Sequence, residues 1–289
     1  MIRNQEVGGS TPPRSIFSLF ANFFMGRPPP RIVAGGRPNR IKPMHRFFCP
    51  QLKLTTYQID LTDSKEIHHL KDVLRLKEDD CVVLFNGKGG EADGIITSIT
   101  PHAVKFLVKA VRKSLKQSIS IIMACAIPKK AKFEFIIEKL TELGVDEIIP
   151  LKTTRTEFKM SAEHIQKKYQ RFEKIVINAA KQSGRVTIPK IHPVIPFKDV
   201  LQICRQPQTL AVIPCLQGSR RHLNNALNQA RKNFSKIIIL IGPEGDFTPE
   251  EVQQAIEIGC IPVTLGKNVL KVDTAAIVTA AFANLFISP

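Results

Sequence analysis

The chain of 289 residues is long enough for two domains of ordinary size, and its 43% of hydrophobic residues can build a core in each. It has no apolar run of membrane-spanning length, and its six cysteines lack disulfide or metal-ligand spacing, so we expect a soluble, cytoplasmic protein without a membrane partner. A net charge of +17 favours a polyanionic partner such as nucleic acid, although membrane surfaces and acidic proteins also attract basic chains.

Residues 1–43 differ in composition from the rest of the chain. They contain the run Pro28-Pro29-Pro30, several arginines and a single acidic residue, Glu6. The apolar stretch Phe17 to Phe24 is short for the hydrophobic part of a signal peptide. Because Met44 to Phe48 resembles a natural start, we expect residues 1–43 to be a disordered or mis-assigned extension. A native peptide that begins before Met44 would contradict this expectation.

Residues 44–114 predict a small β-rich, barrel-like domain. The strand candidates, each bounded by Gly, Pro or Asp, are Cys81 to Phe85, Glu91 to Ile99 and Ala103 to Val111. The segment Asn86 to Gly90 lacks the following helix that a phosphate-binding loop needs, so we interpret it as a hairpin turn.

One helix is predicted in this domain, over Ser64 to Leu74, with Ile67, Leu70, Val73 and Leu74 on one face. The adjacent His68 and His69 point in different directions on a helix and cannot share one metal ion. We therefore expect no metal site.

Residues 115–289 alternate between strand and helix patterns. The strand candidates are Ile119 to Ile127, Glu147 to Leu151, Lys190 to Ile195, Thr209 to Pro214, Ile237 to Ile241 and Ile261 to Leu265. The helix candidates are Lys130 to Leu143, Ala162 to Gln182, Phe197 to Arg205, His222 to Asn233, Pro249 to Ile258 and Ala275 to Phe286. This alternation predicts an α/β domain with a mainly parallel sheet and a ligand outside the carboxyl ends of its strands.

The first notable strand-end loop, Gly242 to Phe247, joins a buried strand to a helix. Such a glycine loop often binds phosphate. Four carboxylates lie in or beside it, on Glu244, Asp246, Glu250 and Glu251. They would repel a phosphate, and only the last two are explained by the capping box of the following helix. A ligand that is neutral at its base and cationic elsewhere fits better, and S-adenosylmethionine has this character.

The second loop, Leu265 to Thr274, leads into a last helix that is apolar or small almost all round. Such a helix is expected to be buried, with alanines that permit close approach of other backbone. The pattern of residues alone slightly favours a core helix without any ligand role.

These segments together resemble the RsmE family of 16S ribosomal RNA (uracil-N3) methyltransferases, over about Met44 to the C-terminus. The motifs that carry the resemblance are MHRFF from Met44, KLTELGV from Lys139, QSGR from Gln182, IGPEGDF from Ile241, and the segment from Leu265-Gly266 to Thr274-Ala275. The loop from Ile241 and the closing segment are fairly specific as a pair.

The resemblance implies a SPOUT methyltransferase: a parallel sheet with a C-terminal trefoil knot, preceded by a PUA-like RNA-binding β-barrel, in a homodimer. It implies that S-adenosylmethionine lies between the two loops. The cofactor residues carried over by position are Ile241, Gly242, Pro243, Glu244, Gly245, Leu265, Gly266, Leu270 and Thr274.

The implied reaction removes the imide proton of a uridine and transfers a methyl group to N3. Arg185 or Lys271 is the candidate for stabilising the developing anion, and Glu244 or Asp273 for accepting the proton. The RNA-binding candidates are Arg46, Arg75, Arg155 and Arg185. For any single arginine in so basic a chain, a solvated surface charge explains it equally well.

The sequence departs from the family at three positions. Lys271 and Asp273 stand where Arg and Glu are usual, and Asp246 replaces a second glycine. Lysine keeps the charge but loses the bidentate fork, and helix capping is an equal alternative for Asp273. The partner implied is 16S ribosomal RNA or the assembled small subunit. Two other hypotheses are a non-catalytic RNA-binding protein, and a SPOUT enzyme acting on another RNA or on a ribose 2′-OH.

Overall fold

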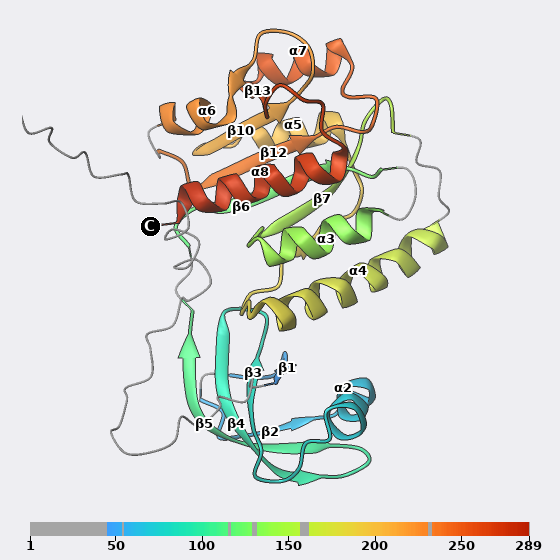
Figure 1. Cartoon of the computed structure of the whole chain (residues 1–289), viewed down its shortest axis with the longest axis vertical. Helices are drawn as coiled ribbons and strands as arrows, with labels where there is room; N and C mark the ends of the chain where they lie inside the picture. Colours follow the sequence, from blue (N-terminus) through green and yellow to red (C-terminus); the bar gives the residue numbers. More distant parts are fainter. Residues whose placement is uncertain are drawn as a thin grey trace, which may run out of the picture. The chain divides into compact units, whose positions relative to one another are not determined.

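In the computed structural model, the described residues are 45–53, 55–114, 117–128, 132–156, 162–230 and 233–288. The expected start at Met44, and the segment before it, lie outside them. Two sheets organise the described chain (Figure 1), one of five strands and one of eight.

The five-stranded sheet has the order β1-β3-β4-β5-β2. Its strands are β1 (Arg46–Phe48), β2 (Gln58–Leu61), β3 (Cys81–Phe85), β4 (Gly90–Ile99) and β5 (Val104–Lys113). β3 and β4 pair antiparallel, so the predicted hairpin at Asn86 to Gly90 is confirmed. Buried side chains from all five strands form one core, which includes Phe47, Leu84 and Phe106. This is the predicted PUA-like, β-rich module.

The eight-stranded sheet contains seven strands in the order β11-β13-β10-β12-β6-β7-β8, with β9 also paired to β7. They are β6 (Ser120–Ala126), β7 (Glu147–Lys152), β8 (Lys190–Ile191), β9 (Ile195–Pro196), β10 (Thr209–Pro214), β11 (Arg221–His222), β12 (Lys236–Ile241) and β13 (Ile261–Thr264). Every pair is parallel, as the βα alternation predicted.

Helices cover both faces of this sheet, so each strand buries successive side chains in opposite cores. In β12, Ile237 and Ile239 enter one core and Ile238 and Leu240 enter the other. The first core is closed by α3 (Lys132–Glu142), α4 (Ala162–Ser183), α6 (Leu223–Gln229) and α8 (Val272–Ile287). The second is closed by α5 (Phe197–Cys204) and α7 (Pro249–Glu257).

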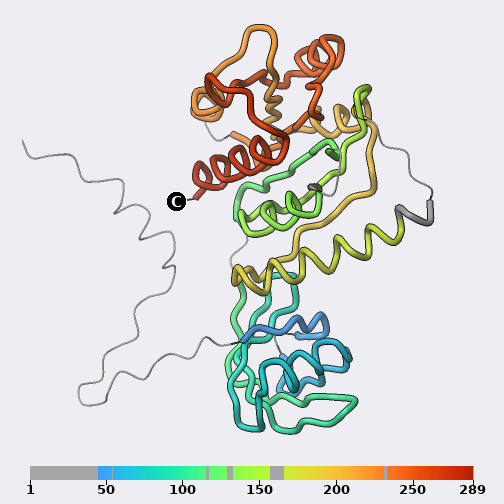
Figure 2. Tube along the Cα trace, turned by 45° about the vertical axis from the view of Figure 1, so that its right-hand side comes forward, coloured from blue at the N-terminus to red at the C-terminus, as the bar shows by residue number. Residues whose placement is uncertain are grey.

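The last helix occupies the centre of its layer. α8 follows the edge-side strand β13 yet packs on β6, β12 and α3 (Figure 2). Most of the residues on its buried side are small, and these let the helix lie close to the sheet. They are Ala276, Thr279, Ala280 and Ala283. The trefoil knot implied by the family resemblance stays a prediction.

Three predicted elements differ in detail. The strand expected over Lys190 to Ile195 is split into β8 and β9, because Pro193 has no N–H for the ladder. The helix expected from His222 begins at Leu223 and ends at Gln229. The helix over Ser64 to Leu74 consists of α2 (Ser64–His68) and the π-helical turn η1 (His69–Val73).

The π-helical turn corrects one core prediction. Val73 was expected on the apolar face with Leu70, but it is 58% exposed whereas Leu70 is fully buried. A π-helical turn holds more residues than an α-helical turn, so it shifts the phase of the following side chains. In the described part of the chain, none of the helices combines the length and the apolar character that crossing a membrane requires.

Candidate cofactor site

Three neighbouring parallel strands place three loops at one edge of the eight-stranded sheet. β10 pairs with β12 on one side and with β13 on the other. The loop after β12 therefore faces the loop after β13 across the end of β10. The sequence predicted the first two of these loops, and the third, Cys215 to Arg220, was not singled out. This third loop could have been predicted as part of the same edge, because β10 was correctly predicted as a strand ending at Pro214.

A pocket of about 620 Å³ lies between these loops, a size suited to a small-molecule ligand. From the loop after β12 it is lined by Ile241, Gly242, Pro243, Glu244 and Asp246. From the loop after β13 and the start of α8 it is lined by Leu265, Gly266, Lys267, Asn268, Val269, Leu270, Lys271, Val272, Asp273 and Ala275. The third loop adds Pro214, Cys215, Leu216 and Arg220.

The charges in the lining balance. Three carboxylates, Glu244, Asp246 and Asp273, are accompanied by three cations, Arg220, Lys267 and Lys271. The carboxylates of the loop after β12 are thus accompanied by cations from the other two loops. Such a lining suits a ligand that carries charges of both signs.

Asp246 fastens the first loop to the third. Its backbone is in the left-handed region, with φ of 60°, where glycine is favoured and Asp is tolerated better than most residues. Its carboxylate Oδ2 accepts a hydrogen bond from the Leu216 N–H at 2.8 Å. Where the family resemblance implies a second glycine, Asp246 therefore exchanges backbone freedom for a cross-loop hydrogen bond.

Thr154 and Arg155, which follow β7, hold the loop after β12 and the start of α7 in place. The Arg155 guanidinium donates to the carbonyl oxygens of Gly245 and Phe247, the latter at 3.3 Å. Glu251, which is 6% exposed, accepts from the Thr154 N–H at 2.8 Å. Its other oxygen accepts from the Thr248 N–H and completes the predicted capping box of α7.

Cys215, in the pocket lining, and Cys125, near the end of β6, both have raised pKa values that favour the neutral thiol. Burial, followed by the nearby Asp246 carboxylate, raises the pKa of Cys215 to about 11. Burial, followed by the Glu244 carboxylate, raises the pKa of Cys125 further. Since the thiolate is the reactive form of cysteine, neither side chain suits nucleophilic catalysis.

Comparison with known proteins gives the family. Residues 115–284 match the RNA methyltransferase domain family, and residues 61–109 match the RNA methyltransferase PUA domain. Ribosomal RNA small subunit methyltransferase E of Mesomycoplasma hyopneumoniae is 31% identical over 81% of this chain and 96% of its own length. The protein of that name in Synechocystis is 33% identical over 76% and 70%. The chain belongs to the ribosomal RNA small subunit methyltransferase E family.

A solved member of the family binds S-adenosyl methionine. The crystal structure of ribosomal RNA small subunit methyltransferase E from Neisseria gonorrhoeae bound to S-adenosyl methionine has a TM-score of 0.74 and 28% identity. The similarity covers 84% of this chain and 97% of that one. The expected family resemblance is thereby confirmed.

Most of the expected cofactor residues of this methyltransferase E family member meet in the pocket. Seven of the nine line it, and Gly245 and Thr274 do not. Lys271, expected beside the substrate, also lines the pocket and occupies the N-cap position of α8 without a side-chain cap bond. Asp273 lies in the first turn of α8 and not at its N-cap, but its Oδ1 accepts a hydrogen bond from the Thr274 N–H at 3.0 Å, so the alternative that it helps to cap this helix is supported.

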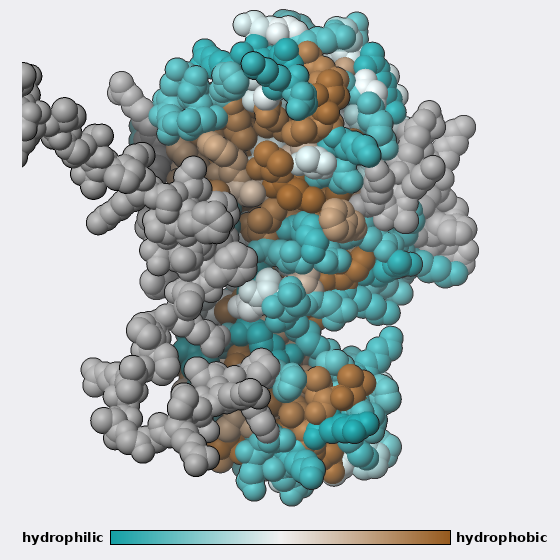
Figure 3. Space-filling view, viewed as in Figure 1, coloured by the Kyte–Doolittle hydropathy of each residue, from teal (hydrophilic) through white to brown (hydrophobic). Residues whose placement is uncertain are grey.

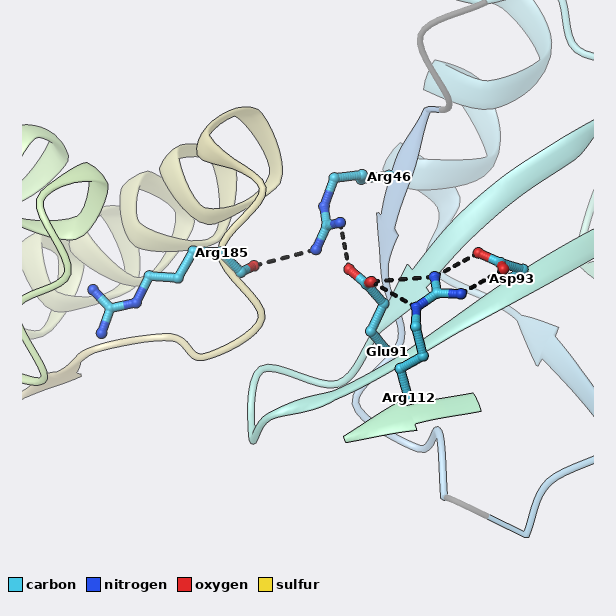
Figure 4. A network of polar contacts seen from close by, with 5 residues as sticks. All are labelled: Arg46, Glu91, Asp93, Arg112 and Arg185. Carbon is cyan, nitrogen blue, oxygen red and sulfur yellow. Dashed lines mark hydrogen bonds and ion pairs between the residues drawn. The ribbon is translucent and has the colours of Figure 1, made fainter. Parts of the chain in front are cut away.

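Arg185 lies elsewhere, and its main-chain oxygen accepts a hydrogen bond from Arg46 (Figure 4). Its guanidinium donates to Thr141 O at 3.0 Å, to Thr187 Oγ1 at 3.0 Å and to Asp146 Oδ1 at 3.2 Å. Its side chain is 11% exposed, and it is not part of the pocket lining within this chain. The local sequence gave no sign of this, because Asp146 and Thr141 are distant in the chain.

The other arginines expected to bind RNA also divide by environment. Arg46, 10% exposed, donates to Glu91 Oε2 at 2.5 Å and to the main-chain oxygen of Arg185 at 3.4 Å, so its guanidinium is used within the protein. Arg155 is engaged with the pocket loop, as described above. Arg75 is exposed, and it follows η1 with φ of 53°.

Proposed function

We propose that this chain transfers the methyl group of S-adenosylmethionine to N3 of a uridine in 16S ribosomal RNA. The observation that carries the proposal is the pocket between the loops after β12 and β13, which contains seven of the nine residues expected around the cofactor. Membership of the methyltransferase E family supports the substrate, since the relatives' names specify small-subunit ribosomal RNA.

The residues of the pocket fit S-adenosylmethionine. Gly266 has φ of +135°, a backbone conformation that side chains rarely adopt, and a Cβ there would meet no atom within 4 Å. Backbone groups of this loop can therefore approach a flat base directly. The carboxylates of Glu244 and Asp246 complement a sulfonium or an ammonium, and Lys267 or Lys271 complements a carboxylate.

When bound, the cofactor supplies an electrophilic methyl group whose sulfur leaves as a neutral thioether. The chain's residues must hold the uridine in line with that methyl group and accept the N3 proton. We assign the proton to the carboxylate of Glu244 or Asp273, and the stabilisation of the anion at O2 or O4 to the Lys271 ammonium. All three residues line the same pocket. Arg185 we assign to a positioning role instead of direct contact with the uracil.

We propose the domain division that the sequence predicted, with the PUA-like module over 44–114 and the methyltransferase domain over 115–289. We place the protein in the cytoplasm, in keeping with its six free cysteines.

The active form is proposed to be a homodimer. α8 carries the exposed apolar residues Val278 and Leu285, which are 42% and 58% exposed, and α3 beside it carries Phe135 at 45%. Hydrophobic residues gather over α8 on the face drawn in Figure 3. A second copy of this chain would bury these side chains.

The test is methyl transfer from labelled S-adenosylmethionine by the purified full-length protein. Small subunits and naked 16S ribosomal RNA from a strain that lacks the gene are the substrates, and the modified nucleotide is then mapped. N3-methyluridine at one position is the expected product. Methylation of a ribose 2′-OH or of another RNA would replace the substrate assignment. Cofactor binding without any transfer would favour a non-catalytic RNA-binding protein.

A further inference from the structure

The long helix α4 carries a row of basic and amide side chains. Residues 167, 171, 174, 178 and 181 recur at intervals of three or four and therefore share one face of the helix. They are Lys167, Arg171, Lys174, Asn178 and Lys181. The buried residues Phe172, Val176 and Ala179 lie on the opposite side, against the core of the large sheet. We call this row the α4 face.

The α4 face is long and positively charged. From residue 167 to residue 181 it spans about 21 Å, at 1.5 Å per residue. Lys167, Arg171 and Lys174 are exposed, and Arg171 also pairs with Glu134 at 2.6 Å. Glu173 is the only acid among the side chains described in α4, and the helical period places it off this face. The positive electrostatic potential along the α4 face therefore favours a bound anion over several turns of the helix.

The α4 face continues into a cleft of about 1020 Å³, which we call the α4 cleft. One wall is α4 itself, through Lys174, Ile177, Asn178, Lys181 and Gln182. The other wall comes from the PUA-like module, through His45, Phe48, Gln51, Lys65 and His69 among others. Glu66 and Lys181 pair within this region, with both carboxylate oxygens 2.7 Å from the Lys181 Nζ.

From these observations we infer that a single strand of the RNA substrate runs along the α4 face and into the α4 cleft. The inference rests on the proposed function, because it names the surface that holds the RNA whose uridine enters the cofactor pocket. Lys167, Lys174 and Lys65 would contact phosphates. Asn178, Gln182 and Gln51 supply the amide donors and acceptors that contact base edges, and the ring of Phe48 is a stacking surface.

An isolated row of lysines on a helix is usually only a solvated surface. Here the row and the cleft share Lys174, Asn178 and Lys181, so the charged face leads into a hollow lined by both modules. The residues of this surface are distinct from those of the cofactor pocket. An acidic protein segment is the competing occupant, and the experiment separates it from RNA.

The decisive measurement is the salt dependence of RNA binding by the full-length protein. The probes are fluorescently labelled single-stranded fragments of 16S ribosomal RNA, titrated over a series of potassium chloride concentrations. Replacing Lys167 and Lys174 together by Gln should lower the slope of log affinity against log salt by about 1.4, because two phosphate contacts with a single strand are lost. Replacement of both by Arg should restore the slope.

A matched control removes two cations from the other face of the sheet. Lys198 and Arg205 are exposed on and directly after α5, which covers the opposite core, and their replacement by Gln should leave the slope unchanged. Equal slopes for the Lys167/Lys174 variant and the wild type would overturn the inference. A loss confined to methylation of assembled subunits, with naked RNA bound normally, would also overturn it and identify a protein contact instead.

The two walls of the cleft can be tested separately. Lys65→Gln, on the PUA-like wall, should lower the slope by about 0.7. An unchanged slope in this variant would show that Lys65 does not contact the RNA, and it would contradict a strand inside the α4 cleft. These binding results do not depend on turnover. A wild-type protein that binds RNA with this salt dependence but transfers no methyl group would refute the proposed function and leave the RNA surface in place.

Discussion

Arg46 and Arg185 lie 139 positions apart in the chain, yet Arg46 Nη2 donates to the main-chain oxygen of Arg185 at 3.4 Å. The contact joins β1 of the five-stranded sheet to the turn after α4 (Figure 4). On the other side of Arg46, Glu91 also binds Arg112, which in turn forms a bidentate pair with Asp93 at 2.5 and 2.6 Å. The residue expected to act on the uracil is thus part of the junction between the two sheets.

Replacing Arg185 by Ala should lower methyl transfer much more than cofactor affinity. The change removes the donor to Thr141 O and Asp146 and frees the turn that Arg46 holds, so the PUA-like module would no longer be fixed relative to the pocket. A stability loss of about 1–3 kcal/mol is expected from the unsatisfied buried groups. Turnover, the KM for RNA, cofactor affinity by calorimetry and thermal unfolding measure these effects.

Two variants separate positioning from general damage. Arg46→Ala should change the KM for RNA in the same direction, since it breaks the same junction. Arg185→Lys keeps the charge and should recover part of the activity. If Arg185→Ala weakened cofactor binding as much as turnover, the positioning role would be excluded.

Replacing Gly242 by Val should weaken S-adenosylmethionine binding by more than ten-fold. A Cβ at Gly242 would lie 3.1 Å from two atoms of the Phe247 ring and 3.3 Å from its main-chain nitrogen. Phe247 is 3% exposed and packs on Phe197, so the loop rather than the ring must move. Calorimetric titration with the cofactor measures the loss, and Gly242→Ala should give a smaller one.

Gly94 provides the matched control for Gly242. A Cβ there would meet the Leu84 side chain, also at 3.1 Å, but in the five-stranded sheet. Gly94→Ala should therefore reduce stability without changing cofactor affinity. Unchanged cofactor affinity in Gly242→Val would count against the pocket.

Three substitutions at Asp246 should separate backbone strain from the cross-loop hydrogen bond. Gly relieves the left-handed backbone but loses the acceptor for the Leu216 N–H. Ala loses the acceptor and keeps the strain, so it should be about 1 kcal/mol less stable than Gly. Asn tolerates the conformation and keeps an acceptor, so it should be the most stable of the three.

Thermal unfolding and cofactor titration of the Asp246 series provide the measurement. If Ala were as stable as Gly, strain at this position would be negligible. Asn also removes the negative charge from the pocket. A cofactor affinity that falls in Asn as far as in Ala would show that the charge, rather than the hydrogen bond, matters for binding.

Replacing Leu285 by Lys should convert the proposed dimer into monomers. Leu285 is 58% exposed on α8, and a lysine there would place a charge in the interface. Ile256 on α7, 42% exposed on the other face of the sheet, is the matched control, and Ile256→Lys should stay dimeric. Sedimentation of both variants measures the mass. A monomeric wild type at all concentrations would refute the dimer.

The parallel sheet was readable from the sequence because its signal is local. Ile237 to Ile241 is a continuous apolar run, as expected for a strand covered on both faces, and the capping box at Thr248 marks the start of the next helix. Glycine and proline positions likewise marked the ends of most elements. The π-helical turn at His69 escaped prediction because its apolar spacing resembles that of an ordinary helix.

The roles of individual charges were not readable in the same way. Sequence placed Glu244 and Lys271 correctly at strand-end loops, and the loops meet because parallel strands end at one edge. No pattern in the sequence indicates that Arg155 and Glu251 support the pocket loop, or that Arg46 contacts Arg185. Those partners are separated by about 90 to 140 positions, and neither periodicity nor turn chemistry encodes such a contact. Local pattern defined the elements, whereas three-dimensional packing selected which cations face solvent and which are held inside the protein.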